Sequence, residues 1–303
     1  MATVFCVGHA VQDFVFSVDA MPDAAEKYRA SAFESCGGGP AATAAVAVSR
    51  LGGRSLLAAR TGDDVIGDTV VQELEAYGVD CSLVRRIADR TSSLSAVIVD
   101  SRGERMIVNY ADPLIETTPN WLPEELPDDV DAVLCDTRWP EGAMYALELA
   151  RQRGVPGVLD ADLPVPPGSE LVQAASHVAF SAAGLAEYSD DEDPERALRK
   201  AADSTDAWCG VTLGREGVRW LDDGELRAIG AFDVEVGDTL GAGDVWHGAF
   251  ALALGEGRDV ADAVTFAGAA AALKVANGHG RAGTPNRQDL DAFMCRHEPV
   301  QPS

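Results

Sequence analysis

The stretch DTLGAGDVWHGAF, Asp238 to Phe250, places a carboxylate directly after Gly-Ala-Gly. Apolar and small residues then recur at helical spacing, at Val245, Gly248, Ala249, Leu252 and Ala253. We therefore expect a turn over residues 241–243 and a helix that Asp244 opens. The first N–H groups of a helix lack internal acceptors and lie at its positive end, so small residues there let an anion approach. A plain Asp N-cap is the competing interpretation, and this stretch alone does not decide between the two.

Length and composition favour one large α/β domain, with room for a small appendage. The chain has 303 residues and a formal net charge of −25, a surface that repels nucleic acid and anionic membranes. The six cysteines are scattered, with no C-x-x-C pair and no metal-ligand spacing, which is typical of reduced thiols. The N-terminus has no basic segment, and no strongly apolar run approaches the roughly 20 residues that span a bilayer. We expect a soluble cytoplasmic protein.

Further along the chain, strand and helix patterns alternate. A buried strand, TVFCVGH, precedes Asp13, and GGGPAATAAVAVSRLGG (37–53) combines a Gly-rich turn with a helix of small residues. Later strand patterns alternate with amphipathic helices, which predicts a mainly parallel sheet covered by helices on both faces. Two segments, 14–35 and 93–112, are polar and alternating instead. We expect them to form a small antiparallel sheet inserted in two pieces.

Several catalytic motifs are absent from the sequence. It contains no Walker G-x-x-x-x-G-K-[ST], no H-E-x-x-H and no G-x-S-x-G. GGGPAA nominally fits a dinucleotide fingerprint, but it does not follow the first buried strand, so that signal is weak. The five histidines are scattered.

Taken in order, these motifs resemble the ribokinase (PfkB) family of ATP-dependent carbohydrate kinases. The resemblance covers nearly the whole chain and rests on Asp13, GGGPAATAAVAVSRLGG, VTLGREG and DTLGAGDVWHGAF. It implies a ribokinase-like nucleotide-binding α/β domain over 1–13, 36–92 and 113–303. Segments 14–35 and 93–112 would then be a β-sheet lid that closes over the sugar and mediates a homodimer.

The resemblance also implies roles for the Gly-Ala-Gly-Asp stretch. Gly241, Ala242 and Gly243 would form an anion hole over the transferring phosphoryl group, and Asp244 would be the catalytic base. Phosphoryl transfer depends mainly on positioning and charge neutralisation, which fixed N–H donors supply. We expect Asp244 to remain ionised because the helix dipole favours its charged form.

Other roles follow from the resemblance alone. Substrate contacts would come from Asp13, Gly38, Gly39 and Thr43. The nucleotide would lie along Thr212, Gly214, Gly217, Asn277 and Gly278. ATP and Mg²⁺ are the expected cofactors, and Asp238 with nearby carbonyls would hold a monovalent cation (K⁺), as in some members.

Two positions depart from the family pattern. Thr43 stands where the family often has an Asn that contacts a sugar hydroxyl, which puts ordinary ribose or fructose recognition in doubt. The Asn-x-x-Glu motif that helps to organise Mg²⁺ is replaced by residues 181–184, Ser-Ala-Ala-Gly. Magnesium would then depend on the ATP phosphates, water and Asp160 or Asp162.

Within the family, EKYRA, GERMIVNY, DTRWPEGA and GRAGTP are most similar to sulfofructose kinases, which phosphorylate O1 of 6-deoxy-6-sulfofructose. Lys27, Asn109 and Arg138 lie in three of these stretches and together suit a sulfonate, which has one negative charge and three acceptor oxygens. The same triad suits a sugar phosphate or a sugar acid. The alternatives are therefore a kinase for fructose, tagatose 6-phosphate or ketodeoxygluconate, a nucleoside kinase, and a non-catalytic sugar-binding protein.

Overall fold

The computed structural model describes residues 1–301, and within them the main sheet has nine strands in the order β13-β12-β11-β10-β9-β8-β1-β4-β5. The strands are β1 Thr3–Val7, β4 Arg54–Gly62, β5 Asp80–Ile87, β8 Ala132–Asp136, β9 Gly157–Ala161, β10 His177–Ser181, β11 Trp208–Thr212, β12 Val218–Asp222 and β13 Glu225–Ile229. All neighbours pair in parallel except at β12 and β13, which add an antiparallel hairpin at one edge. The mainly parallel sheet predicted from the alternating pattern is confirmed.

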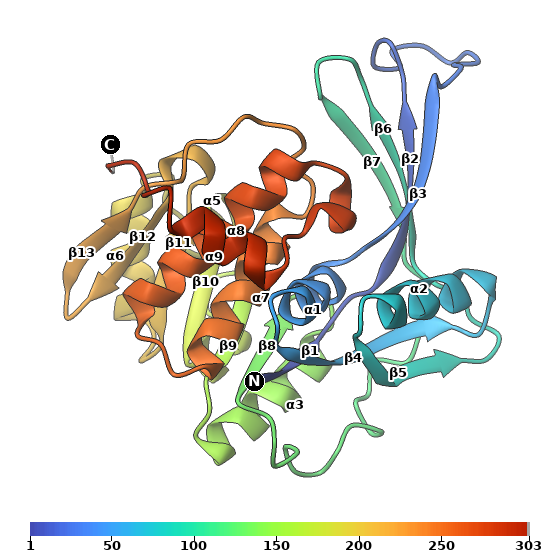
Figure 1. The fold of residues 1–303 in the computed structure, drawn as a ribbon. Coiled ribbons are helices and arrows are strands. Elements are labelled where there is room, and N and C mark those ends of the chain that lie inside the picture. Colours follow the sequence, from blue (N-terminus) through green and yellow to red (C-terminus); the bar gives the residue numbers. More distant parts are fainter. Residues whose placement is uncertain (302–303) are drawn as a thin grey trace.

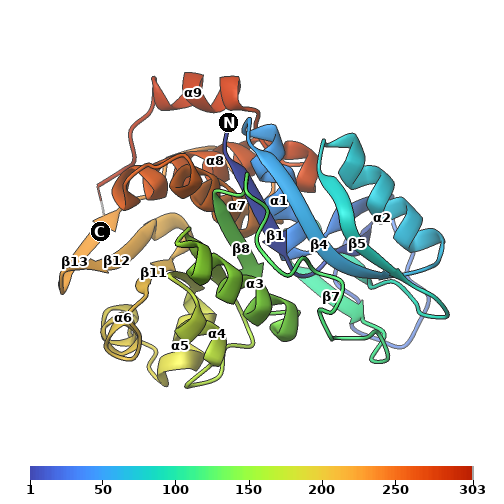
Figure 2. The same ribbon diagram turned by 90° about the horizontal axis from the view of Figure 1, so that it is seen from below.

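Helices cover both faces of this sheet, as Figure 2 shows. They are α1 Pro40–Arg50, α2 Val65–Ala76, α3 Pro140–Arg153, α4 Glu170–Ala174, α5 Ala182–Ser189, α6 Pro194–Asp203, α7 Ala242–Gly255, α8 Val260–Asn277 and α9 Arg287–Met294, with short 3₁₀ turns at Gly214–Glu216 and Gly280–Gly283. Alternate side chains of β1 separate the two cores: Val4 and Cys6 pack with α1, α7 and α8, and Phe5 and Val7 pack with α3.

The small residues of α1 and α7 let these two helices pack closely. A Cβ at Gly248 of α7 would lie only 2.5 Å from the carbonyl oxygen of Ala44 in α1. This contact holds the middle of α7 against α1. By length and composition alone, helix α8 could span a membrane. In this structure it packs against α7 and α9 as a core helix.

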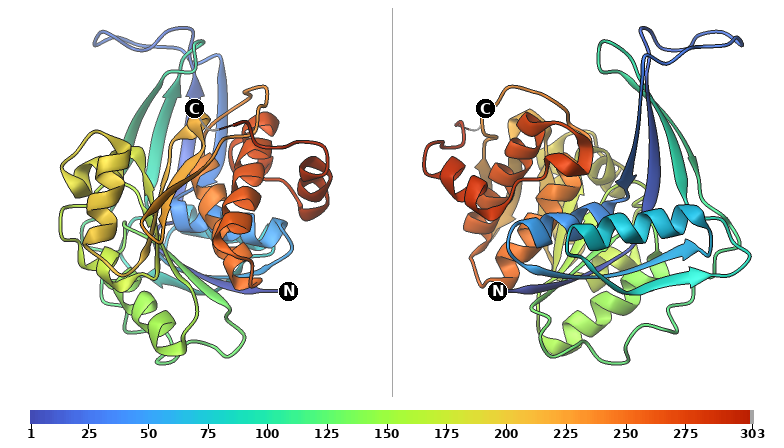
Figure 3. Two further views of the ribbon diagram at one scale, coloured as in Figure 1. Left: turned by 90° about the vertical axis from the view of Figure 1, so that its left-hand side faces the viewer. Right: turned by 45° about the vertical axis from the view of Figure 1, so that its right-hand side comes forward.

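A second, smaller sheet projects from the main body (Figures 1 and 3). Its order is β3-β2-β6-β7, with β2 Val11–Ser17, β3 Ala32–Gly38, β6 Leu94–Val99 and β7 Arg105–Tyr110. The expected antiparallel pairing is wrong in one place, because β2 and β6 pair in parallel. The chain leaves the main sheet after β1 and again after β5, whose strands point the same way, so β2 and β6 set out in the same direction.

Strand bounds differ from the sequence expectations at both ends of the first inserted segment. Strand β2 begins at Val11, so Asp13 belongs to the small sheet, whose first segment was expected to start at residue 14. Strand β3 begins at Ala32 and ends at Gly38, so the small sheet extends past residue 35, where the expected inserted segment ends.

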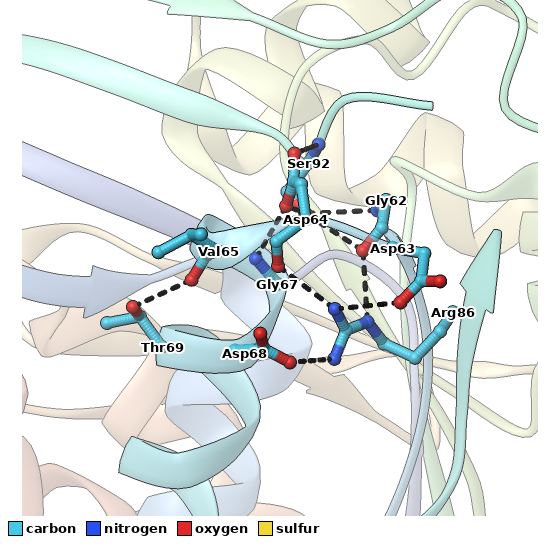
Figure 4. Close-up of polar contacts among 9 residues, drawn as sticks. All are labelled: Gly62, Asp63, Asp64, Val65, Gly67, Asp68, Thr69, Arg86 and Ser92. Carbon is cyan, nitrogen blue, oxygen red and sulfur yellow. Dashed lines mark hydrogen bonds and ion pairs between the residues drawn. The ribbon is translucent and has the colours of Figure 1, made fainter. Parts of the chain in front are cut away.

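A hydrogen-bond network anchors the base of the small sheet to the main one (Figure 4). Asp64 caps α2 by accepting from the Gly67 N–H (2.8 Å), and it also accepts from the N–H (2.9 Å) and hydroxyl (2.6 Å) of Ser92, which enters β6. Partial burial opposes ionisation, but the hydrogen bonds from Ser92 and Gly67 outweigh it and lower the pKa of Asp64. Arg86 donates to the carbonyls of Gly62 (3.0 Å) and Asp64 (3.0 Å) and so closes the network.

Candidate active site

The candidate site lies where the sheet order changes direction, at the carboxyl ends of β1 and β8. In open α/β sheets this switch point forms a crevice in which ligands bind. Here Asp136, the last residue of β8, accepts from the N–H groups of His9 (2.7 Å), Ala41 (3.1 Å) and Arg138 (2.8 Å). A Cβ at Gly8 would lie 2.2 Å from the Asp136 carboxylate, so the glycine makes room for it. The N-cap residue of α1, Gly39, has no side chain to accept a hydrogen bond, so the Asp136 carboxylate caps this helix instead.

The Gly-Ala-Gly turn lies at the start of α7, beside α1. Gly241 is the N-cap residue with φ 75°, and Asp244 is the third helical residue, so the helix opens at Ala242 and not at Asp244. The Ala242 N–H donates to the Thr239 carbonyl (3.2 Å), which leaves the other N–H groups of this first turn as the donors available to an anion. A Cβ at Gly241 would lie 3.4 Å from the Thr43 methyl and 3.7 Å from an Asp244 oxygen, so both side chains flank the turn.

Asp244 has an electrostatic environment that its position in the helix did not predict. Burial, reinforced by the Asp160 carboxylate, raises the pKa of Asp244 to about 7, although His247 and Arg281 act in the opposite direction. The expectation that the helix dipole keeps this group fully ionised is therefore wrong for the free protein. A carboxyl group with a pKa near neutrality is well matched to general base catalysis.

His247 supports the Gly-Ala-Gly turn from inside the core. Its Nδ1 lies 2.8 Å from the Gly243 carbonyl and its Nε2 lies 3.2 Å from the Ala179 carbonyl and 3.4 Å from Asp160 Oδ1. Burial lowers the pKa of His247 and raises that of Asp160 well above its usual range, in the second case with help from the Asp136 and Asp162 carboxylates. His247 is thus a positioning group beneath the turn.

On the small sheet, one row of paired residues crosses all four strands. Cys36, Asp13, Ser95 and Asn109 are opposed in register, so their side chains share the face that carries Asp13. Asn109 Nδ2 lies 3.1 Å from Ser95 Oγ, and a hydrogen bond with Ser95 partly offsets the effect of burial, which raises the pKa of Asp13. This row gives the expected substrate residues Asp13 and Asn109 a common face.

The glycines at the end of β3 are required by close packing. A Cβ at Gly38 would lie 2.1 Å from the Asp13 carboxylate, and one at Gly39 would lie 2.4 Å from the His9 carbonyl. Gly39 also has φ 93°, which favours glycine. Both glycines therefore let the small sheet meet α1 directly beside Asp13.

Arg281 is the site residue that the sequence reasoning missed. Its buried guanidinium donates to the Gly38 carbonyl (2.6 Å), lies 3.4 Å from Thr43 Oγ1, and pairs with Glu73 of α2 at 3.4 Å. It also acts electrostatically on both Asp13 and Asp244. Its signal was the stretch GRAGTP, in which one arginine stands among small residues.

The three residues expected to hold an anion are not in contact with one another in this chain. Lys27 is exposed in the loop at the far tip of the small sheet, whereas Arg138 follows the end of β8 in the main sheet (Figure 1). Arg138 instead lies 3.4 Å from Asp162. A second guanidinium, Arg60 at the end of β4, stacks on Trp139 at 4.6 Å and, like Arg138, depresses the pKa of His9, which burial already lowers.

The residues expected along the nucleotide lie at two loops. Thr212 ends β11 and donates to the Phe180 carbonyl (3.3 Å), and Gly214 adopts φ 56° in an open position. Gly217 has a packing reason of its own, since a Cβ there would lie 2.0 Å from the Ile229 carbonyl. Asn277 donates to the Gly283 carbonyl (2.9 Å), and Gly278 ends α8 with φ 66°. Their contacts explain these loops structurally and leave nucleotide binding a prediction.

Metal ligands are sparse around this site. Within residues 1–301, no group of three or more His, Cys, Asp or Glu side chains is arranged to hold a metal ion. Asp160 and Asp162 offer carboxylate oxygens of the kind that Mg²⁺ prefers, but too few for a complete protein site. Asp238, the expected monovalent cation ligand, is ion-paired with Lys274 (3.2 Å) and Arg105 (2.6 Å).

Comparisons with known proteins agree with this geometry. The pfkB family carbohydrate kinase model matches residues 1–287. A protein of Bacillus subtilis (strain 168) named ribokinase is 29% identical over 297 residues, which is 97% of this chain and 100% of the relative. An ATP-dependent ribose-1-phosphate kinase of Halopiger xanaduensis is 26% identical over 299 residues, with 97% and 98% covered.

Among solved structures, a putative ribokinase from Agrobacterium tumefaciens superposes with a TM-score of 0.89 at 36% identity, covering 97% of this chain and 98% of the other. Because the superposition covers nearly the whole of both chains, it includes the small sheet as well as the main one. The family match, the relatives and the ribokinase-like fold lead to one conclusion: this chain belongs to the pfkB family of carbohydrate kinases and is an ATP-dependent sugar kinase.

Proposed function

We propose that this kinase transfers the γ-phosphoryl group of ATP to a hydroxyl of an anionic sugar, with O1 of 6-deoxy-6-sulfofructose as the first candidate. The observation that carries the anionic substrate is the pair of guanidiniums, Arg60 and Arg138, that stand at the ends of β4 and β8 on either side of β1. The Nε of Arg60 is buried without a hydrogen-bond partner among residues 1–301. In a chain of net charge −25, two cations at one edge of the site favour a negative ligand.

In this proposal Asp244 takes the proton from the attacking sugar hydroxyl. Its pKa of about 7 lets it accept that proton near neutral pH, and its place in the first turn of α7 sets it beside the N–H groups of that turn that have no acceptor. These donors stabilise the negative charge on the phosphoryl group during transfer. Asp13 and Asn109 bind sugar hydroxyls from the shared face of the small sheet.

Lys27 reaches the substrate only when the small sheet moves, because its loop lies at the sheet's tip (Figure 3). We assign the sheet as a lid whose hinge is at Gly38 and Gly39. Mg²⁺ arrives with ATP, and Asp160 and Asp162 supply the nearby carboxylates that hold its water shell. When bound, the ion neutralises phosphate charge. We place the enzyme in the cytoplasm, where ATP is available.

The outer face of the small sheet fits a homodimer. The register aligns Phe33, Phe16 and Met106 on the face opposite Asp13, and Phe14 and Val108 continue it. Phe33 is 58% exposed and Val108 is 63% exposed. An apolar sheet face of this kind favours association, here with a second copy of the chain.

A substrate panel tests the proposed function. ADP release from MgATP is measured with sulfofructose, fructose 6-phosphate, tagatose 6-phosphate, ribose 1-phosphate, ketodeoxygluconate, fructose, ribose and adenosine. We expect kcat/KM for the best anionic sugar to exceed that for the matched neutral sugar by at least about 10²-fold, because only the charged sugar offers an anionic partner to the guanidiniums of Arg60 and Arg138. Equal rates on fructose and its charged analogues would refute the anionic-substrate proposal.

A sugar phosphate is the second candidate. The relative from Halopiger xanaduensis is named for ribose 1-phosphate, and two guanidiniums suit a phosphate as well as a sulfonate. The panel separates the two, since sulfonate carries one charge and phosphate close to two at neutral pH.

A further inference from the structure

The ammonium group of Lys274 is buried beside the turn that leads into the catalytic helix. The side chain is fully buried in α8, and its Nζ lies 3.0 Å from the Asp238 carbonyl oxygen and 3.2 Å from Asp238 Oδ2. A buried ammonium is costly unless it is paired and hydrogen-bonded. Both acceptors here belong to one residue of the turn, so the cation acts on that turn in particular.

Both carboxylate oxygens of Asp238 also accept hydrogen bonds from other groups. Oδ1 accepts from the Leu240 N–H (2.9 Å) and from Arg105 (2.6 Å), and Oδ2 accepts from the Gly280 N–H (3.1 Å). A dissociable K⁺ needs several free oxygen ligands and no competing cation. Asp238, with an ammonium and a guanidinium already on it, does not fit that requirement, so the expected monovalent cation site is not supported by these residues.

The turn that Lys274 holds is directly connected to the anion hole. The N–H groups of Gly237 (3.0 Å) and Asp238 (3.1 Å) donate to the Val275 carbonyl at the end of α8, and the chain reaches Gly241 three residues later. The position of the N–H donors beside Asp244 therefore depends on how this turn is fixed to α8.

We propose that the Lys274 ammonium is a built-in cation, which orders the 237–241 turn in this chain so that catalysis needs no K⁺. Lys274 is a positioning residue, because it reaches the reacting groups only through Asp238. The simpler alternative is an ion pair that stabilises the fold without affecting the catalytic turn. The two interpretations differ in one respect. If the ammonium positions the turn, a small cation added to the buffer can restore activity when Lys274 is replaced, whereas a purely structural ion pair predicts no such rescue.

The first experiment compares salts on the wild-type enzyme at constant ionic strength. KCl, NaCl and tetramethylammonium chloride are compared, the last having a cation too large for a small site. We expect kcat with MgATP and a sugar that turns over, the MgADP affinity by calorimetry, and Tm to be the same in all three salts, with rates within about twofold. The MgADP and Tm measurements do not depend on the sugar's identity. Saturable activation by K⁺ of about fivefold or more would overturn the proposal.

The second experiment removes the ammonium. Lys274→Met keeps the length of the side chain and loses the charge. We expect kcat in tetramethylammonium chloride to fall by about 10- to 100-fold, as for a small misplacement of catalytic groups, and to recover in part in about 0.1 M KCl or NH₄Cl. Lys200→Met is the control, because Lys200 is a surface lysine paired with Asp191 at 3.0 Å, and it should behave like wild type in every salt.

If Lys274→Met does not fold, the proposal is still tested, because the salt comparison uses the wild-type enzyme alone. If folded Lys274→Met is as active as wild type, or loses activity that no small cation restores, the ion pair is only structural and the proposal is wrong.

Discussion

The replacement Asp244→Asn should affect activity and stability in opposite directions. The substitution keeps the shape of the side chain and removes both the proton acceptor and the half-buried charge. Loss of a positioned general base costs at least about 10²-fold in kcat. ATP binding should be unchanged, because the N–H donors of the turn belong to the backbone.

The stability effect follows from the direction of the pKa shift. Because burial and Asp160 raise the pKa of Asp244 to about 7, the folded protein binds this proton more tightly than the unfolded chain does. The contribution is therefore favourable at pH below about 4 and is lost as pH rises through about 7. The difference from the ordinary value of 3.8 corresponds to about 4 kcal/mol. Since the carboxyl group is partly accessible and screened by water, we expect about 1–2 kcal/mol.

Asp244→Asn should thus be more stable than wild type at pH 8, with Tm higher by roughly 2–6 °C, and about equal to it at pH 4.5. Thermal unfolding at the two pH values measures this, and kcat for the best sugar measures the activity. Asp262→Asn is the matched control, because Asp262 is also the third residue of its helix, α8, but is exposed; it should change neither quantity. If Asp244→Asn turns over near the wild-type rate, or its stability relative to wild type does not change with pH, the reasoning about this residue is refuted.

Four further outcomes are expected. For wild type, kcat/KM should fall with a one-proton slope below pH about 7, and Arg281→Met should move that limb to higher pH, because loss of the cation raises the pKa of Asp244 further; an unmoved limb would contradict an electrostatic effect of Arg281 on Asp244. Arg138→Ala should lower kcat/KM for the anionic sugar by about 30- to 1000-fold, with Arg138→Lys restoring it in part and with little change for the neutral sugar or for ATP affinity; an equal loss on both sugars would make Arg138 structural. Asp64→Ala should destabilise the protein by about 1–2 kcal/mol in chemical denaturation, and this difference should shrink as pH falls below the unfolded pKa and through the lower folded one, because the pKa of Asp64 is lowered in the folded state. Val108→Glu should shift the enzyme from dimer to monomer in light scattering, and a wild-type monomer at micromolar concentration would refute the lid interface.

The main sheet could be predicted from the sequence because its signals are local. Alternating strand and helix patterns specify a parallel sheet, and the polar period-two pattern of two separated segments specifies a second, smaller one. The parallel pairing of β2 with β6 could not be read in the same way, since it depends on which edge of the main sheet each strand leaves. Register between strands about 80 residues apart has no local signal.

The candidate site was predicted only where its signals are local. The turn at Gly241 and the helix after it follow from neighbouring residues, whereas Arg281 meets Thr43 from 238 positions away. The charge state of Asp244 shows the limit of a local argument most clearly. A helix dipole acts through the adjacent backbone and predicts an ionised group. Burial and the Asp160 carboxylate, which comes from strand β9, together have the larger effect and raise the pKa of Asp244.

The distribution of charge around Asp244 connects these observations to catalysis. Burial and neighbouring carboxylates raise the pKa of two groups at this edge of the sheet: Asp136 and Asp162 act on Asp160, and Asp160 and Asp136 act on Asp244. Arg281 opposes this effect on Asp244, but its guanidinium is also paired with Glu73 and so cannot neutralise the whole cluster. A ligand that brings positive charge, such as phosphate-bound Mg²⁺, would lower the pKa of Asp244 and make it a stronger acceptor at neutral pH at the moment when both substrates are bound. The base would then be protonated and less reactive in the empty enzyme and ionised in the ternary complex. This predicts that the acidic limb of kcat lies at lower pH than that of kcat/KM, and equal limbs in the two profiles would show that bound MgATP does not act on Asp244.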